Sequence, residues 1–300
     1  MEMEYHRSVL LQETVDGLNI KEDGVYVDVT FGGGGHSKEI LNRLGAKGKL
    51  YGFDQDEDAK NNAIDDERFV LIPQNFRHIK RFLKFYGVQS VDGILGDFGV
   101  SSHQFDVPER GFSTRFDADL DMRMSKQNTL SAYDVVNTYD QGDLKRVFGL
   151  YGELKNAGSI AAALVEKRAE QPIKTTENLK NSLRKFLPAY KENKILAQLY
   201  QAIRIEVNQE VEVLREFLLQ TPELIKQKGR LSLISYHSLE DRLVKRFIRS
   251  GKFEGEVEKD FYGNPQVPFK KVSGLIVPSK QEIEINSRAR SAKLRIAEKL

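Results

Sequence analysis

The chain has 300 residues, of which 40% are hydrophobic and 30% are charged, a composition typical of a folded globular protein with a substantial core. It contains no cysteine, which excludes disulfide frameworks, cysteine-ligated zinc, iron–sulfur clusters and cysteine nucleophiles. No uncharged apolar stretch is long enough to span a membrane, and the acidic start lacks a signal-peptide core. We therefore expect a cytoplasmic protein with no membrane partner.

The formal net charge is only +2, but the charges are unevenly distributed along the chain. Residues 1–104 carry 12 basic and 17 acidic side chains, whereas residues 207–300 carry 18 basic and 13 acidic ones. A basic C-terminal third favours a polyanionic partner such as nucleic acid, and ordinary solvation of the surface is the alternative interpretation.

The first third of the chain alternates between short apolar runs and amphipathic stretches. Ser37 and Asp56 each stand where they can cap a following helix. Repeated strand–helix units of this length predict a parallel sheet that is covered by helices on both faces. The strands are predicted at 25–30, 50–53, 69–72 and 91–95, with helices at 38–44 and 76–86.

The pattern changes after residue 104, because no strand is predicted from there to residue 206. Helices are expected instead at 141–150, 159–170, 176–186 and from 194 toward 219. A fifth strand is expected at 229–236, followed by a helix capped from Ser238, a mobile loop at 251–268 and an edge strand at 291–296. The predicted fold class is α/β, with a helical domain at 105–206 inserted between the two parts of an α/β domain, 1–104 and 207–300.

A run of four glycines, Gly32 to Gly35, follows the first predicted strand and precedes a helix. Glycines let the backbone approach a ligand, and a helix N-terminus offers unpaired N–H groups to an anion. Close packing of strand and helix is the alternative. The dinucleotide fingerprint Gly-x-Gly-x-x-Gly fails in both registers, because Ser37 or Lys38 takes the place of its third glycine. A nicotinamide dinucleotide is therefore disfavoured.

Aspartates follow the second and fourth predicted strands. Asp54 stands 20 residues after Gly34, where a carboxylate can accept hydrogen bonds from ribose hydroxyls. Asp97 lies at the sheet edge where ligands bind in open α/β folds, and it can hold a cofactor ammonium group or accept a hydrogen bond from a substrate amine. A ribose-bearing cofactor without a pyrophosphate, such as S-adenosylmethionine, fits best. A capping or satisfied loop aspartate is the alternative at each position.

None of the five histidines is spaced as a metal-binding pair, so we expect no metal. His36 belongs to the glycine run and His237 follows the fifth predicted strand. Both are candidates to line one crevice, because the carboxyl ends of parallel strands meet at the same edge of a sheet.

Eight short runs of the sequence carry a family resemblance. They are His6–Glu13, Asp28–Ser37, Asp97–Gln104, Glu109–Ser113, Leu120–Met124, Tyr200–Asn208, Ser235–Arg242 and Arg288–Ser291. Together they are similar to the signatures of the bacterial 16S rRNA cytosine-N4 methyltransferase family. The resemblance covers nearly the whole chain, although the family commonly has Leu, Pro and Leu where this chain has Phe98, His103 and Phe105.

This resemblance implies a Rossmann-like methyltransferase sheet that binds S-adenosylmethionine. It implies transfer of a methyl group to the exocyclic N4 amine of a cytidine in the decoding region of 16S ribosomal RNA, within the small ribosomal subunit. Related amino-methyltransferases also place a polar residue at this edge of the sheet, where it accepts a hydrogen bond from the target amine, so Asp97 is a candidate catalytic residue as well as a cofactor contact. The cofactor contacts carried over by position are Gly34, Gly35, His36, Asp54, Phe76, Asp97 and Gln104.

An amine target agrees with the composition, because methylation of cytosine carbon 5 needs a thiolate and the chain has no cysteine. Two alternatives stay open: a nicotinamide dehydrogenase on a similar sheet, and a non-catalytic RNA-binding assembly factor that has kept the cofactor pocket. We expect RNA contact from the basic C-terminal residues Arg242, Lys245, Arg246, Arg288 and Arg290.

Overall fold

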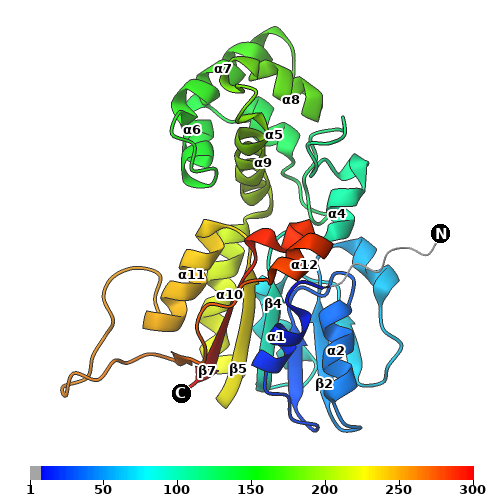
Figure 1. Cartoon of the computed structure of the whole chain (residues 1–300), viewed down its shortest axis with the longest axis vertical. Coiled ribbons are helices and arrows are strands. Elements are labelled where there is room, and N and C mark those ends of the chain that lie inside the picture. Colours follow the sequence, from blue (N-terminus) through cyan, green and yellow to red (C-terminus); the bar gives the residue numbers. More distant parts are fainter. Residues whose placement is uncertain (1–7) are drawn as a thin grey trace. The chain divides into compact units, whose positions relative to one another are not determined.

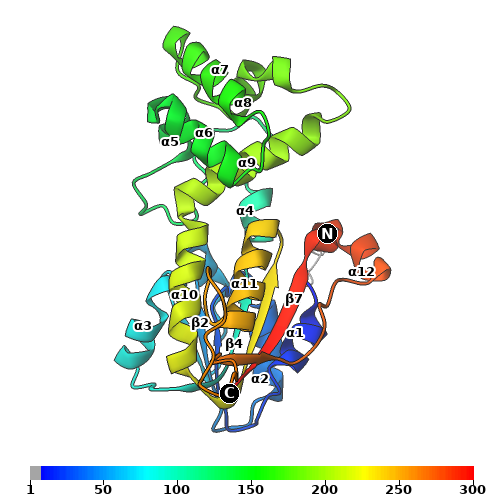
Figure 2. The same ribbon diagram turned by 90° about the vertical axis from the view of Figure 1, so that its left-hand side faces the viewer.

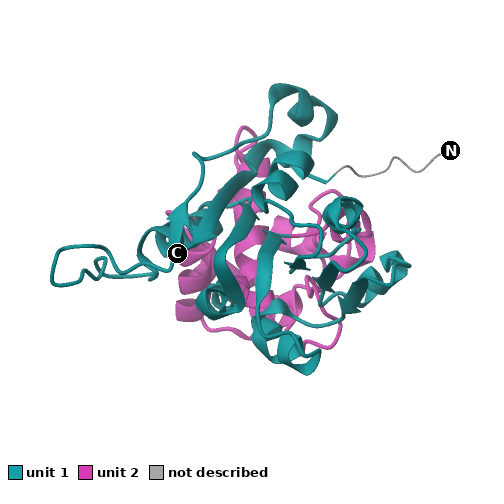
Figure 3. Cartoon of the chain, turned by 90° about the horizontal axis from the view of Figure 1, so that it is seen from below, with its two compact units in different colours: residues 1–99, 211–300 teal, residues 100–210 magenta. Residues whose placement is uncertain are grey.

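The computed structural model describes residues 8–300, which form two compact units (Figure 1 and Figure 3). The first unit consists of the described residues up to Gly99 together with Val211–Leu300, and the second is Val100–Glu210. The helical range predicted at 105–206 lies within the second unit. Of the eight signature runs, only His6–Glu13 begins outside the described residues.

The first unit is built on a seven-stranded sheet with the strand order β3-β2-β1-β4-β5-β7-β6. Strands β1 to β5 run parallel, whereas β7 is antiparallel to β5 and β6 is antiparallel to β7. The order reverses between β1 and β4, so the predicted Rossmann-like α/β class is confirmed. The strands are β1 (Val25–Asp28), β2 (Lys49–Phe53), β3 (Phe69–Ile72), β4 (Val91–Asp97), β5 (Ile225–Ser235), β6 (Phe269–Lys271) and β7 (Lys293–Lys299).

Helices cover both faces of this sheet, as predicted, because alternate strand residues point to opposite faces. Tyr26 and Leu95 pack with α1 and α2 on one face, whereas Val27 and Ile94 pack with α3, α10 and α11 on the other (Figure 2). The helices of this unit are α1 (Leu11–Gly17), α2 (Gly35–Arg43), α3 (Ile79–Phe85), α10 (Glu210–Leu224), α11 (Ser238–Ser250) and α12 (Lys280–Ile285), with the 3₁₀ helices η1 (Glu57–Asn62), η2 (Phe76–His78) and η5 (Ser287–Ser291).

The second unit is helical, and its described residues contain no strand beyond an isolated bridge between Asp119 and Thr175. The single helix predicted from 194 toward 219 is wrong: Gln209 adopts a left-handed φ of 52° and separates two helices. The helices of this unit are α4 (Ser102–Asp106), α5 (Ala132–Thr138), α6 (Gln141–Leu150), α7 (Ala157–Glu170), α8 (Thr176–Ser182) and α9 (Glu192–Asn208), with the 3₁₀ helices η3 (Pro108–Arg110) and η4 (Arg184–Phe186).

Two predicted helix caps differ from those in the structure. Gly34 rather than Ser37 is the N-cap of α2, because the Ser37 hydroxyl donates to Asp28 instead. His237 rather than Ser238 caps α11, through its reciprocal bonds with Glu240. No described helix combines the length with the apolar character that a membrane crossing requires.

Candidate active site

Three aspartates stand at the carboxyl ends of neighbouring parallel strands in the first unit. Asp28 ends β1, Asp97 ends β4, and Asp54 follows β2. In an open α/β sheet, the crevice that binds ligands lies at this edge, beside the point where the strand order reverses. The candidate site is therefore built around these carboxyl groups.

Asp28 is buried, and the sequence analysis did not identify it as a site residue. Its Oδ2 accepts a hydrogen bond from the Ser37 hydroxyl at 2.7 Å, and its Oδ1 accepts one from the Thr30 N–H at 3.1 Å. The Thr30 hydroxyl in turn accepts a bond from the Asp97 N–H at 2.6 Å. Asp28 thus links the glycine loop to the end of β4. The strand predicted at 25–30 placed Asp28 inside the strand, and only the end of β1 at Asp28 gives it the strand-end position shared with Asp54 and Asp97.

The glycine loop that connects β1 to α2 requires glycine at two of the predicted contact positions. Gly34 has a φ of 75°, a left-handed conformation that side chains rarely adopt. A Cβ on Gly35 would lie 2.0 Å from the Ser8 hydroxyl oxygen, whereas a Cβ on Gly33 would meet nothing within 4 Å. One side of the loop is therefore packed against the chain, and the side at Gly33 is open.

Asp54 holds this loop against the end of β2. Its Oδ2 accepts a bond from the Gly32 N–H and its Oδ1 one from the Asp56 N–H, each at 2.8 Å. Asp56, not Asp54, caps the following helix η1, as predicted. Burial raises the pKa of Asp54 to about 6. Each carboxylate oxygen keeps a lone pair, so the group can still accept from ribose hydroxyls.

Asp97 has one carboxylate oxygen, Oδ1, that is buried without a hydrogen-bond partner among the described residues. The Tyr236 hydroxyl donates to the same carboxylate, and burial raises the pKa of Asp97 to about 6. The neighbouring His36 opposes this rise. A buried, unpartnered carboxylate oxygen is costly in the free protein, and it is suited to receive a donor from a bound ligand.

His36 is only 5% exposed, and its Nε2 lies 3.1 Å from the Val9 carbonyl oxygen. Burial lowers the pKa of its imidazole, which favours the neutral form that donates this bond. The side chain thus fixes the chain that precedes α1 against the start of α2. A cofactor contact from His36 stays a prediction.

Phe76 lies at the start of η2 and joins an aromatic cluster beneath the end of β4. Its ring centroid is 5.8 Å from that of Phe98 and 5.4 Å from that of Phe217. Phe98 is one of the positions where the chain departs from the resembled family, and its larger ring fills this cluster. Phe76 therefore reaches the residue that directly follows Asp97.

Gln104 belongs to the second unit, unlike the other predicted contacts. It is buried in α4 and forms a capping box there: its Oε1 accepts from the Ser101 N–H, and its own N–H donates to the Ser101 hydroxyl. Its predicted contact with the cofactor stays a prediction.

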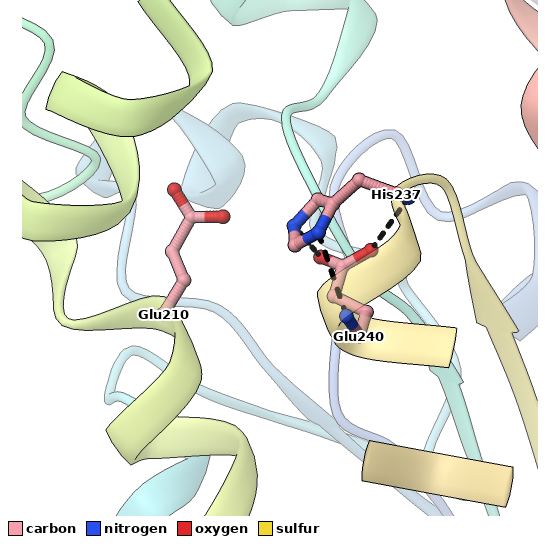
Figure 4. A group of neighbouring side chains, drawn as sticks. All are labelled: Glu210, His237 and Glu240. Atoms are coloured by element: carbon pink, nitrogen blue, oxygen red, sulfur yellow. Dashed lines mark hydrogen bonds and ion pairs between the residues drawn. The ribbon is translucent and has the colours of Figure 1, made fainter. Parts of the chain in front are cut away.

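His237 and Glu240 form a compact pair at the start of α11 (Figure 4). Glu240 Oε2 accepts from the Tyr236 N–H at 2.9 Å, and His237 Nε2 lies 3.0 Å from Glu240 Oε1. The pair thereby holds the segment that carries the Tyr236 hydroxyl toward Asp97. Glu210, also drawn in Figure 4, is the last residue of the second unit and pairs with Arg204 at 2.7 Å.

Two buried side chains join the signature runs of the second unit. Arg110 donates to the carbonyls of Arg123 and Met124, each at 3.0 Å. The Asn208 amide donates to the Met122 carbonyl at 2.8 Å and accepts from the Met124 N–H at 2.8 Å. The runs at 109–113, 120–124 and 200–208 are therefore held together by polar side chains that bond to backbone.

The whole chain matches a known protein family. Residues 3–300 match the MraW methylase family. This chain belongs to that family. Proteins named ribosomal RNA small subunit methyltransferase H are similar to it: that of Flavobacterium johnsoniae is 70% identical, covering 99% of both chains, and that of Cytophaga hutchinsonii is 56% identical, covering 98% of this chain and 99% of the relative.

Members of the MraW methylase family are S-adenosylmethionine-dependent methyltransferases, so the predicted methyltransferase family and cofactor are confirmed, and the cytosine-N4 specificity stays a prediction. A solved structure described as a putative rRNA-methylase from Clostridium thermocellum covers 98% of both chains at 12% identity, with a TM-score of 0.46.

Proposed function

We propose that this methyltransferase transfers the methyl group of S-adenosylmethionine to the exocyclic N4 amine of a cytidine in the decoding region of 16S ribosomal RNA. The curated relatives carry the name ribosomal RNA small subunit methyltransferase H, which supports small-subunit ribosomal RNA as the substrate. The observation that supports an amine most directly is the buried Asp97 carboxylate with its unpartnered Oδ1.

The residues at the sheet edge fit the cofactor. We propose that the open backbone at Gly33 and the helix start at Gly34 and Gly35 accommodate its amino-acid part, and that Asp54 accepts its ribose hydroxyls. Phe76 offers an aromatic surface at the same edge. The bound cofactor supplies an electrophilic methyl group on a positively charged sulfur. Carboxylates at this edge favour such a cation.

Asp97 is then the residue that acts on the amine. The lone pair of an exocyclic amine is conjugated with the cytosine ring, so the nitrogen must be held in line with the methyl group. As the new carbon–nitrogen bond forms, the nitrogen becomes positive and must release one proton. An ionised Asp97 can accept the hydrogen bond and then the proton, and Tyr236 keeps the carboxylate oriented.

The chain has no cysteine, which fits an amine target because no covalent adduct with the ring is needed. The base must leave its stack to reach a recessed site, as in other enzymes that modify bases.

We propose that the first unit is the methyltransferase domain and that the second is its helical insertion. We also propose that the reaction takes place in the cytoplasm, without a metal.

For RNA contact, we propose the basic C-terminal residues. Lys245 and Arg290 are exposed, and Arg242 lies on the same outer side of α11 as Lys245. The nearby acid Asp241 is already paired with Arg295 at 2.7 Å. Charge reversal of Arg288 and Arg290 to glutamate should weaken binding of small ribosomal subunits several-fold and flatten its salt dependence. Reversal of the exposed Lys47 and Lys228 is the matched control, and equal effects would remove the C-terminal assignment.

Nucleoside mass spectrometry of 16S ribosomal RNA tests the activity itself. A strain that lacks the gene should lose N4-methylation of one cytidine, and the wild-type protein with S-adenosylmethionine should restore it on isolated subunits. An assembly factor without catalytic activity would leave the modification unchanged in the deletion strain, and that result would overturn the proposal.

A further inference from the structure

The segment between α11 and β6, which its composition predicts to be a mobile loop, folds back on itself as a hairpin around a turn at its tip. Its arms are joined by a bridge between Lys259 and Pro265, and it extends from the sheet of the first unit as the long orange loop of Figure 1. At its tip, the Asp260 carboxylate accepts bonds from the backbone N–H groups of Tyr262 and Asn264, at 2.9 and 2.8 Å, and from the Asn264 side-chain amide at 2.9 Å.

This turn presents two adjacent aromatic rings to solvent. Phe261 is 96% exposed and Tyr262 is 85% exposed, and their rings lie edge-on to each other at a centroid distance of 5.5 Å. Large aromatic rings are ordinarily among the most buried side chains. A hydrogen-bonded turn that holds two of them outward indicates a surface for binding a partner.

The charges around the two rings are mixed and include one available cation. Glu258 pairs with Lys252 and Glu254 pairs with Arg215, which neutralises two of the three glutamates on the first arm. The Asp260 carboxylate accepts hydrogen bonds within the turn, which hold it in place but leave its negative charge. Lys259, next to the rings, is exposed and has no ion pair among the described residues. The tip therefore combines flat aromatic faces with an available cation, the pair of features that binds single-stranded nucleic acid.

We propose that the tip of this hairpin, Lys259 to Tyr262, binds the substrate RNA by stacking an unpaired nucleobase on Phe261 or Tyr262, with Lys259 at the adjacent phosphate. The inference rests on the proposed function, since it assigns a second contact to the same RNA substrate. The contact is separate from the carboxylates at the sheet edge, so it contributes to affinity rather than to the methyl-transfer step.

The test compares paired substitutions at the tip, with unmethylated small ribosomal subunits as the probe. Phe261→Ala with Tyr262→Ala should weaken binding about 5- to 100-fold with an unchanged salt dependence, because stacking releases no counterions. Phe261→Leu with Tyr262→Leu keeps apolar bulk but removes the flat faces, so it should bind as weakly as the alanine pair. Phe85→Ala, which removes a ring that is 79% exposed on α3, should bind like the wild type.

Fluorescence gives a second, direct readout. The chain contains no tryptophan, so Tyr262→Trp places a single reporter at the tip. Its emission should be quenched when a single-stranded oligoribonucleotide is added, as expected for a ring stacked on a base. These substitutions lie on exposed side chains, so all variants should fold and bind S-adenosylmethionine normally.

Wild-type affinity in the alanine pair would overturn the proposal. Wild-type affinity in the leucine pair alone would also overturn it, since that result indicates an apolar contact with a ribosomal protein. Either outcome leaves the proposed function intact if the wild-type enzyme still methylates cytidine N4. Absence of that methylation in the wild type would instead refute the proposed function, whatever the tip does.

Discussion

The two units differ in whether key buried polar side chains find hydrogen-bond partners within the fold. In the second unit, the side chains of Arg110 and Asn208 form hydrogen bonds with backbone groups of the same unit. In the first unit, one buried carboxylate oxygen of Asp97 has no hydrogen-bond partner among the described residues. Both carboxylate oxygens of Asp54 can accept a further hydrogen bond. A satisfied buried group stabilises the fold, whereas an unsatisfied one is costly unless a ligand supplies the missing partner. Under the proposed function, this difference distinguishes a scaffold residue such as Asn208 from a candidate site residue such as Asp97.

The largest effect should follow from removing the Asn208 amide. Asn208→Ala leaves the Met122 carbonyl and the Met124 N–H without partners, and should lower the free energy of unfolding by about 3 kcal/mol. Urea denaturation measures this loss, with the exposed Asn181→Ala as a control that should change it by less than about 0.5 kcal/mol. Affinity of the folded variant for S-adenosylmethionine should stay unchanged. A stability equal to that of the wild type would break the comparison.

Removing the charge of Asp97 should change cofactor affinity and reaction rate without lowering stability. Asp97→Asn should leave stability unchanged or raise it, because it removes a desolvated carboxylate. It should weaken cofactor affinity and lower the single-turnover rate about 10- to 100-fold. The two quantities are measured separately on one folded variant, at saturating cofactor for the rate. A loss of affinity alone would make Asp97 a cofactor contact, and wild-type values for both would place the chemistry elsewhere.

Asp54 combines the two behaviours, because its carboxylate accepts hydrogen bonds from backbone N–H groups and is also proposed to bind the cofactor. Asp54→Ala should weaken S-adenosylmethionine binding by about 2 kcal/mol, or about 30-fold in Kd, because ribose hydroxyls and the Gly32 N–H lose their acceptor. Calorimetric titration checks this value. Asp65→Ala, the loss of an exposed carboxylate in the same region, is the control. Equal affinity in the two variants would remove Asp54 from the site.

The smallest expected effect comes from a change of pH, which alters the charges at the candidate site without a mutation. Burial raises the pKa values of Asp28, Asp54 and Asp97 to about 6, from 3.8. The folded protein therefore binds protons near pH 5 to 6 that the unfolded chain has already released. These three carboxyl groups should make the free energy of unfolding of the ligand-free protein rise as the pH is lowered from 7 to 5, and His36, whose pKa burial lowers, opposes part of that rise.

Over the same interval, affinity for the cationic cofactor should fall, because these carboxyl groups lose their charge. Urea denaturation and calorimetry at several pH values give both curves. The rise in stability should be smaller in Asp97→Asn, which has one fewer titrating group. Affinity that is constant between pH 7 and 5 would contradict the assignment of these carboxyl groups to the cofactor.

Local patterns in the sequence were sufficient to predict the parallel strands, the glycine loop and the aspartates at the strand ends. Such features depend on residues within a few positions of one another: the apolar run of β4, the glycines that permit a left-handed turn at Gly34, and the acid that follows each strand. The signature runs predicted the family and the cofactor for the same reason, because each run is short and contiguous.

Only the tertiary structure decided which partners those residues find. The Ser37 hydroxyl donates to Asp28 instead of capping its own helix, and a left-handed Gln209 ends a helix whose apolar periodicity continues beyond it. The tip of the segment at 251–268 folds into a turn around Asp260, which its composition does not reveal. The sequence determined which groups are candidates for the chemistry, whereas long-range contacts decided which of their polar atoms find a partner within the fold.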